Sequence, residues 1–137
     1  MDRDRRTLLR QGVLFLLLSV LIGIVVAAGA PHPSKWMAVH ITGLMTGLLL
    51  IAFGSLWADV RLSLKAKRRA MLLALTASWG GLLSNVFIAA VNLPGPATDP
   101  GRQPEAAWQL IVFVAFLAVV VPTTIASFAM VWSGLRG

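Results

Sequence analysis

The sequence predicts an all-α fold, a bundle of four transmembrane helices, from its composition and from the spacing of its charges. Of the 137 residues, 58% are hydrophobic and only 12% are charged, whereas a soluble domain is about 25% charged. About 20 apolar residues cross the ~30 Å hydrocarbon layer as a helix. Little of the chain lies elsewhere, so we expect residues 1–137 to form a single integral-membrane domain. Four uncharged runs of at least 19 residues stand out, at 12–30, 36–58, 70–91 and 106–135.

The first run, 12–30, follows a basic segment and ends in Ala28-Gly29-Ala30, which gives it the outline of a cleavable signal peptide. Its apolar stretch is longer than the usual core of about 7–15 residues, however, and Pro31 follows the cleavage position. We therefore expect a retained helix, joined to the second run by a short turn that contains two prolines.

The second run, 36–58, contains His40 near its start. An ionisable side chain at this depth is costly unless protein buries it and gives it a partner, so it marks a functional site by default. Gly43, Gly47 and Gly54 follow at offsets of +3, +7 and +14, close to one helical face. Such a smooth stripe lets another surface approach closely, whether a helix, a neighbouring subunit or a flat cofactor.

The third run, 70–91, places Trp79 about 15 Å beyond Arg69, near the middle of the bilayer. Its indole N–H needs an acceptor or a protein interior there, so the ring either packs between helices or lines a ligand cavity. Asn85 falls at a depth similar to that of His40. It is expected either to join helices by hydrogen bonds or to share with His40 a pocket that opens towards the outer face.

A connection rich in proline and glycine, 92–105, precedes the fourth run. A loop of this length is either a plain connector or a lid over a cavity. The fourth run, 106–135, contains Pro122, which removes one helix hydrogen bond and bends the helix. We expect neighbouring Thr and Ser hydroxyls to satisfy backbone groups around this bend.

The basic residues are distributed unevenly along the chain. Ten of the 12 Lys and Arg residues lie before the first run, between the second and third, or after the fourth; only Lys35 and Arg102 lie in the other two connections. This asymmetry predicts that both termini are cytoplasmic, in the inner membrane of a cell. The net charge of +7 is then a topology signal that also attracts anionic membrane lipids. We expect no nucleic-acid partner.

The residue inventory excludes several kinds of chemistry. Cysteine and tyrosine are absent, and the four runs contain no Asp, Glu, Lys or Arg. Transport through an embedded carboxylate and an acyl-transfer triad are therefore not expected. A single histidine cannot hold a bare transition metal in a set of three or four ligands. It can be the one axial ligand of haem, whose porphyrin supplies four nitrogens. A purely structural His40 is the alternative.

The segment His40-Ile-Thr-Gly-Leu-Met-Thr-Gly47 resembles the second span of hydroxylaminobenzene mutase and the matching span of styrene oxide isomerase, two small four-span membrane isomerases. The resemblance covers nearly the whole chain. It includes the opening Ala107-Trp108-Gln109 of the last span and the ending Trp-x-Gly-Leu-Arg at 132–136. It implies that His40 binds the iron of haem b, in a homotrimer with haem near the subunit interfaces.

Three positions depart from the family pattern. Thr46 stands where the family usually has Asn, and Asn85 is the position nearest to a substrate-contacting tyrosine of the epoxide isomerase. A third-span Asn of the family is replaced by Gly81. The resemblance therefore supports haem binding better than it supports any particular substrate.

The activity that the resemblance implies is an isomerisation. Ferric haem b on His40 would act as a Lewis acid on a small aromatic substrate that enters from the lipid. An arylhydroxylamine would give an aminophenol, or an aryl epoxide an aldehyde. We expect Asn85 and Thr46 to orient the polar group and Trp79 to pack against the ring.

The remaining cofactor contacts are also predicted by position. Gly43 and Gly47 would leave room for the haem, and Lys35 and Arg102 would pair with its propionates or with lipid phosphate. Two other function classes stay open. The chain could be a non-catalytic haem protein for electron transfer or sensing, or a structural membrane subunit without a cofactor.

Overall fold

The computed structural model describes residues 3–94, 101 and 106–136. This part of the chain consists of four α-helices and contains no strand. Each helix is long and apolar enough to cross a membrane, so the predicted all-α fold of four transmembrane helices is confirmed. The helices are α1 (Arg3–Ala27), α2 (Pro33–Leu56), α3 (Leu64–Ala90) and α4 (Ala107–Arg136).

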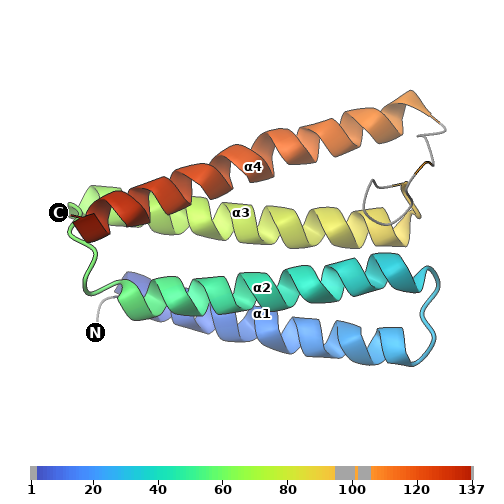
Figure 1. Cartoon of the computed structure of the whole chain (residues 1–137), viewed down its shortest axis with the longest axis horizontal. Helices are drawn as coiled ribbons and strands as arrows, with labels where there is room; N and C mark the ends of the chain where they lie inside the picture. Colours follow the sequence, from blue (N-terminus) through green and yellow to red (C-terminus); the bar gives the residue numbers. More distant parts are fainter. Residues whose placement is uncertain (1–2, 95–100, 102–105, 137) are drawn as a thin grey trace.

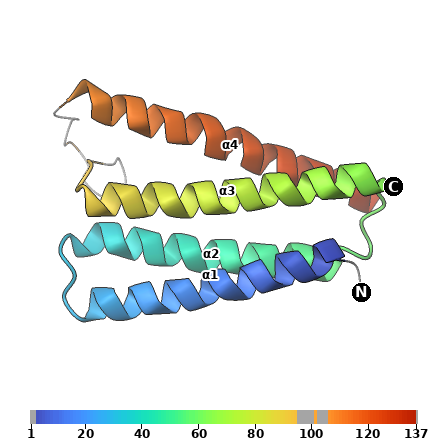
Figure 2. The same ribbon diagram turned by 180° about the vertical axis from the view of Figure 1, so that it is seen from behind.

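The helices form two antiparallel hairpins that meet along α2 and α3 (Figure 1). Helix α1 packs mainly on α2, and α4 packs mainly on α3. Both chain termini lie at one end of the bundle, which we call the terminal end; the turn between α1 and α2 lies at the opposite end, the loop end. Towards the loop end α4 diverges from α3, as both views of the ribbon show (Figure 2).

Several helix boundaries differ from the uncharged runs by three or more residues. Helix α3 begins at Leu64 rather than at residue 70, because Ser63 caps it: the Ser63 hydroxyl accepts a hydrogen bond from the Ala66 backbone N–H at 3.3 Å. Helix α1 likewise begins in the basic segment, since Arg and Lys are good helix formers. It ends earlier than predicted, at Ala27, and Gly29 then adopts a left-handed conformation with φ of 92°.

Glycines bring α1 and α2 into close contact. A Cβ atom built on Gly47 would lie 2.9 Å from the carbonyl oxygen of Gly12, and one on Gly12 would lie 2.8 Å from the Gly47 carbonyl oxygen. A Cβ on Gly43 would lie 3.0 Å from the Cβ of Ser19. Of the three surfaces that the glycine stripe allows, the one present here is therefore a helix.

Lys35 connects the two hairpins at the loop end. Its side chain is only 2% exposed, and its Nζ donates hydrogen bonds of 2.7 Å to Asn92 Oδ1 and to the Leu93 carbonyl oxygen. These acceptors follow the last turn of α3, where a cation is stabilised by the unpaired carbonyls and by the helix dipole. Lys35 thus fixes the start of α2 against the end of α3.

At the terminal end, backbone and side-chain contacts fasten the α2–α3 connection. The Arg61 N–H donates to the Gly134 carbonyl oxygen at 2.7 Å, and Lys67 Nζ donates to the Trp57 carbonyl oxygen at 3.1 Å. Tryptophans near the ends of membrane spans commonly form an interfacial aromatic belt, but Trp57 is 1% exposed and belongs to the core. Trp108 and Trp132, at 48% and 58% exposed, do lie on the surface.

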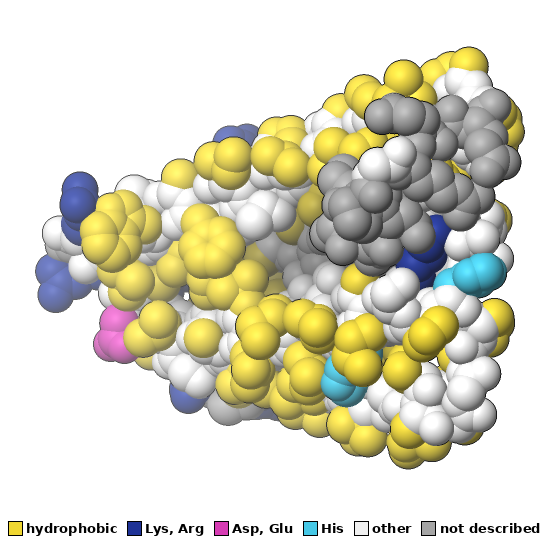
Figure 3. Space-filling model, turned by 45° about the vertical axis from the view of Figure 1, so that its right-hand side comes forward, with side chains coloured by type: hydrophobic (Ala, Val, Ile, Leu, Met, Phe, Trp, Pro, Cys, Tyr) yellow, Lys and Arg dark blue, Asp and Glu magenta, His cyan; other side chains and the backbone are white. Residues whose placement is uncertain are grey.

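Helix α4 is the least covered of the four. Only three of its residues are buried, and large apolar side chains cover its outer face. Figure 3 shows hydrophobic side chains over much of the flank, with Lys and Arg gathered at the terminal end. Around Pro122 the hydroxyls of Thr123 and Thr124 donate to the Val119 and Val120 carbonyl oxygens, each at 2.7 Å. These hydroxyls bond to carbonyls near the proline, but the carbonyl that loses its helix hydrogen bond at Pro122 is that of Ala118, four residues earlier.

The glycine contact gives the first prediction. Gly47→Ala and Gly81→Ala add the same methyl group and the same helix propensity, but a Cβ on Gly81 would meet only Val120 Cγ1 at 3.8 Å. We expect Gly47→Ala to be less stable than Gly81→Ala by about 1–3 kcal/mol, because α1 must shift away from α2. Circular dichroism during unfolding in SDS measures the difference. Equal stabilities would show that the two helices separate at no cost.

Candidate functional site

The His40 side chain is held by the backbone of α1. Its Nδ1 lies 2.7 Å from the Ser19 carbonyl oxygen and 3.1 Å from Ser19 Oγ. The Ser19 hydroxyl in turn donates to the His40 carbonyl oxygen at 2.6 Å. Serine and histidine are thus linked in both directions across the α1–α2 contact.

These bonds determine the tautomer of the imidazole. A carbonyl oxygen can only accept a hydrogen bond, so Nδ1 carries the proton that it donates to Ser19. In the neutral ring Nε2 is then the unprotonated nitrogen, with its lone pair directed away from Ser19. This is the arrangement found in metal-ligating histidines, in which an outer hydrogen bond orients the ring and raises its basicity.

The ring also needs space on α1, which Gly23 provides. A Cβ on Gly23 would lie 2.9 Å from Nδ1 and Cε1 of His40. His40 itself is half-buried. Gly43 and Gly47, which were expected to leave room for a flat cofactor, are instead buried against α1, so that room is filled in the single chain.

A cavity of about 230 Å³ lies between α2, α3 and α4; we call it the interhelical cavity. It contains two of the predicted substrate-side residues, Thr46 and Asn85, which the structure therefore brings together. The Thr46 hydroxyl forms no hydrogen bond with the described residues, whereas the Ser78 and Thr124 hydroxyls donate to carbonyls of their own helices. The lining residues are Thr42, Thr46, Leu49, Ala74, Ala77, Ser78, Gly81, Asn85, Val120, Thr124 and Ser127.

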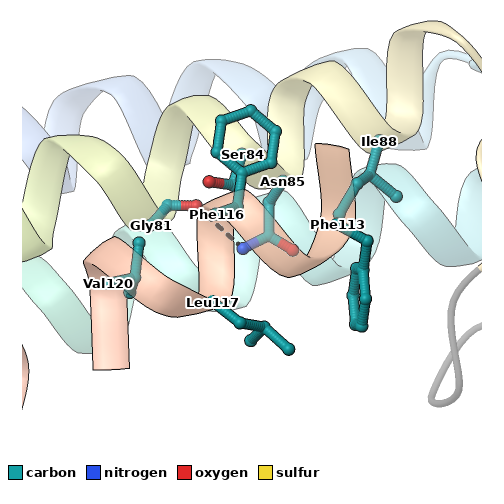
Figure 4. Close-up of a pocket in the computed structure, with 8 residues that line it drawn as sticks. All are labelled: Gly81, Ser84, Asn85, Ile88, Phe113, Phe116, Leu117 and Val120. Atoms are coloured by element: carbon teal, nitrogen blue, oxygen red, sulfur yellow. Dashed lines mark hydrogen bonds between the residues drawn. The ribbon is translucent and has the colours of Figure 1, made fainter. Parts of the chain in front are cut away.

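A second cavity of about 150 Å³ lies between α3 and α4 (Figure 4); we call it the α3–α4 pocket. It shares Gly81, Asn85 and Val120 with the interhelical cavity, so the two spaces meet at Asn85. Most of its lining is apolar, and two of its side chains are phenylalanines. The lining residues are Gly81, Ser84, Asn85, Ile88, Phe113, Phe116, Leu117 and Val120.

The Asn85 side chain has a defined orientation. Its Nδ2 donates to the Gly81 carbonyl oxygen at 2.9 Å and to Thr42 Oγ1 at 3.4 Å. The amide cannot be reversed, because Oδ1 would then face the Gly81 carbonyl oxygen. Asn85 thus joins α3 to α2, as one of the two sequence interpretations proposed. Its Oδ1 points away from the Gly81 contact, into the pocket (Figure 4).

Neither of the two cavities that the described residues line contains both His40 and Asn85, so the shared pocket expected from the sequence is not found there. His40 faces α1, whereas Thr42 and Thr46 of the same helix face the interhelical cavity. The difference arises from the turn of α2: residues 40 and 42 point in nearly opposite directions at 3.6 residues per turn. Helix α2 therefore separates the histidine from the two cavities described here.

Trp79 lines neither of these cavities. Its ring packs edge-on against Phe15, with ring centroids 4.8 Å apart, and its Nε1 donates to Gln11 Oε1 at 3.2 Å. Its observed contacts are those of the packing interpretation. The aromatic rings beside Asn85 are those of Phe113 and Phe116 instead.

The predicted propionate contacts have different outcomes. The Lys35 ammonium group is directed to the end of α3 by two hydrogen bonds, and Arg102 lies outside the described residues. Within the described ranges there is no group of three or more His, Cys, Asp or Glu side chains that could hold a metal ion. Of the two histidines, only His40 lies within a helix.

Sequence reasoning missed five residues that shape these sites. Ser19 and Gly23 hold and accommodate His40, Gln11 pairs with Trp79, and Phe113 and Phe116 line the pocket. Small residues at positions 12, 19 and 23 share one face of the first span and could have indicated a partner for the glycine stripe. The spacing of three between the phenylalanines places them on one face of the last span.

Known proteins resemble this chain over nearly its full length. A model of the family described as styrene oxide isomerase matches residues 4–135. Over 134 residues the chain is 26% identical to hydroxylaminobenzene mutase HabB of Ectopseudomonas oleovorans. The aligned region covers 96% of this chain and 80% of that protein. No solved structure matches it. Because the family model spans almost all of the four-helix domain, the chain belongs to the styrene oxide isomerase family, whose relatives are isomerases or mutases.

Proposed function

We propose that this protein is a membrane isomerase that binds ferric haem b through His40 Nε2 and rearranges a small aromatic substrate. The observation that carries the proposal is the hydrogen bond from His40 Nδ1 to the Ser19 carbonyl oxygen. It leaves the other ring nitrogen as the only lone pair of the imidazole that is available to a metal.

The residues present fit such a group. Haem needs one strong protein ligand because the porphyrin supplies four, and His40 is one ionisable ligand in an otherwise apolar segment. The Ser19 carbonyl and the space beside Gly23 hold the ring in one orientation before any cofactor binds. This reduces the entropy that a freely rotating ligand would lose on coordination.

When bound, ferric haem supplies a Lewis acid that polarises a substrate oxygen or nitrogen. Two substrate classes follow from the family and from the relative named hydroxylaminobenzene mutase. In an aryl epoxide, a C–O bond breaks and a hydride moves to the neighbouring carbon, which gives an aldehyde. In an arylhydroxylamine, the N–O bond breaks and the hydroxyl forms a C–O bond with a ring carbon; the proton lost from that carbon balances the proton gained by the nitrogen, which gives an aminophenol. Both changes are isomerisations that consume no electrons.

The chain's own residues bind and orient the substrate. Asn85 Oδ1 and the Thr46 hydroxyl face the cavities that meet at Asn85, and neither group forms a hydrogen bond with a described residue. Phe113 and Phe116 provide aromatic faces for a substrate ring. The apolar lining keeps water from the reacting group, which strengthens each of these polar contacts. Leu117, 45% exposed, opens the pocket towards lipid, from which an apolar substrate can enter.

The separation of His40 from Asn85 across α2 supports a site that is built from two subunits. We propose a homotrimer in the inner membrane, with His40 of one subunit and the Asn85 cavities of the next forming one site. The half-buried His40 ring and the poorly covered α4 supply surfaces for such contacts. A closed ring of three identical subunits repeats the same site three times.

The haem ligand can be tested by its absorption spectrum. His40→Ala is expected to lose the Soret band of the purified protein, whereas the wild type shows a five-coordinate ferric spectrum that shifts on addition of an amine. The matched control is His32→Asn, since His32 is exposed in the turn with φ of 54°, a conformation that Asn tolerates. A full haem complement in purified His40→Ala would refute the ligand assignment.

The composite site can be tested by mixing subunits. His40→Ala and Asn85→Leu subunits should each be inactive alone, with either an arylhydroxylamine or an aryl epoxide as substrate. Co-expressed in equal amounts, they should regain about a quarter of wild-type activity, because one interface in four then combines an intact His40 with an intact Asn85. Mixed oligomers that stay inactive while both variants assemble normally would place the two residues' functions in one chain.

A further inference from the structure

The polar groups of the α3–α4 pocket are unequal in what they offer a ligand. Two of its side chains, Ser84 and Asn85, carry polar atoms. The Ser84 hydroxyl donates to the Gly80 carbonyl oxygen at 2.5 Å. Both hydrogens of the Asn85 amide are also engaged, by the Gly81 carbonyl oxygen and by Thr42 Oγ1. The pocket side chains therefore have no donor left for a ligand.

The Asn85 carbonyl oxygen is in the opposite situation. Oδ1 accepts no hydrogen bond from any described residue, and it points into the pocket beside Phe113 and Leu117 (Figure 4). An amide oxygen in an apolar environment is destabilised until a donor reaches it. The pocket thus presents one unpaired acceptor in an aromatic and aliphatic lining.

The size of the pocket is suited to a single aromatic ring. Its volume is about 150 Å³, and an apolar cavity of roughly this volume accommodates benzene. Phe113, Phe116 and Ile88 provide the apolar contacts, and the unpaired oxygen of Asn85 lies where a substituent on the ring would meet it.

We propose that Asn85 Oδ1 makes this pocket selective for aromatic molecules whose ring substituent donates a hydrogen bond, such as arylamines, arylhydroxylamines and phenols. The proposal rests on the proposed function for its relevance to turnover, and it chooses between the two substrate classes left open there. An aryl epoxide carries only an acceptor oxygen, which would leave Asn85 Oδ1 unpaired and would itself find no donor among the pocket side chains. An arylhydroxylamine carries N–H and O–H donors beside the ring.

The test measures binding and needs neither haem nor turnover. The purified full-length protein is titrated with 4-fluoroaniline, fluorobenzene and 4-fluorostyrene oxide, and fluorine NMR reports the bound fraction after correction for partition into empty micelles. We expect the aniline to bind about 3- to 10-fold more tightly than the other two, the gain from one neutral hydrogen bond. Asn85→Leu removes the acceptor and should abolish this preference. Ser55→Ala removes an exposed α2 hydroxyl that bonds to the Ile51 carbonyl oxygen and should keep it.

Equal binding of the three probes to the wild type would overturn the proposal, and this comparison depends on no variant folding. A preference for the aniline that survives in folded Asn85→Leu would overturn it as well. The haem spectrum of Asn85→Leu separates this inference from the proposed function: a retained Soret band with lost selectivity supports both. A Soret band missing from the wild type would refute the haem assignment and leave the binding result standing.

Discussion

The backbone carbonyl oxygen, which can accept a hydrogen bond but never donate one, is the constraint on which both candidate sites depend. Inside a bilayer no water competes for these oxygens, so a side chain beside one must turn a donor towards it. The Ser19 carbonyl oxygen accepts a hydrogen bond from Nδ1 of His40, and the Gly81 carbonyl oxygen accepts one from the amide of Asn85. In each case the opposite, accepting atom is directed outwards. Helix geometry thus orients both side chains for the roles proposed above, a metal ligand for His40 and a substrate acceptor for Asn85.

The position of the Ser19 carbonyl depends in turn on packing. In a membrane, helices gain no hydrophobic energy by associating, and close contact of small residues supplies the attraction instead. Gly12 and Gly47 let α1 approach α2 so closely that a methyl group on either would collide with backbone, and Gly43 lies directly against the Ser19 side chain. Only at that separation does the Ser19 carbonyl come within 2.7 Å of the imidazole. Gly43 and Gly47 were expected to leave space for a cofactor. They act on the site indirectly instead, by holding α1, the helix whose Ser19 carbonyl orients His40.

The sequence was sufficient to predict the four spans and the place of His40 inside one of them, but not the directions in which the helix faces point. Long uncharged runs have only one stable solution in a bilayer, which is why the four helices were predictable. Depth in the bilayer also follows from the constant rise per helical residue, so Asn85 could be expected at a depth similar to that of His40. The direction in which each helix face points, however, depends on the neighbouring helix against which it packs. His40 and Asn85 lie in the same half of the bundle but on different sides of α2, and no one-dimensional pattern contains that rotation. The packing of Trp79 could not be predicted for the same reason, because its hydrogen-bond acceptor, Gln11, is 68 positions away in the sequence.

The two hairpins are packed unevenly, and this difference matches the different roles proposed for His40 and Asn85. The α1–α2 hairpin holds His40 in a tight contact. This suits the metal ligand proposed above, because small errors in ring orientation weaken a metal bond. The α3–α4 hairpin contains the more accessible pocket, and α4 diverges from α3 towards the loop end (Figure 1). An apolar substrate dissolved in lipid needs such a loosely covered helix, because it must pass between side chains rather than through water. Rigidity at His40 and access at Asn85 are opposing demands, and the fold meets them on separate pairs of helices.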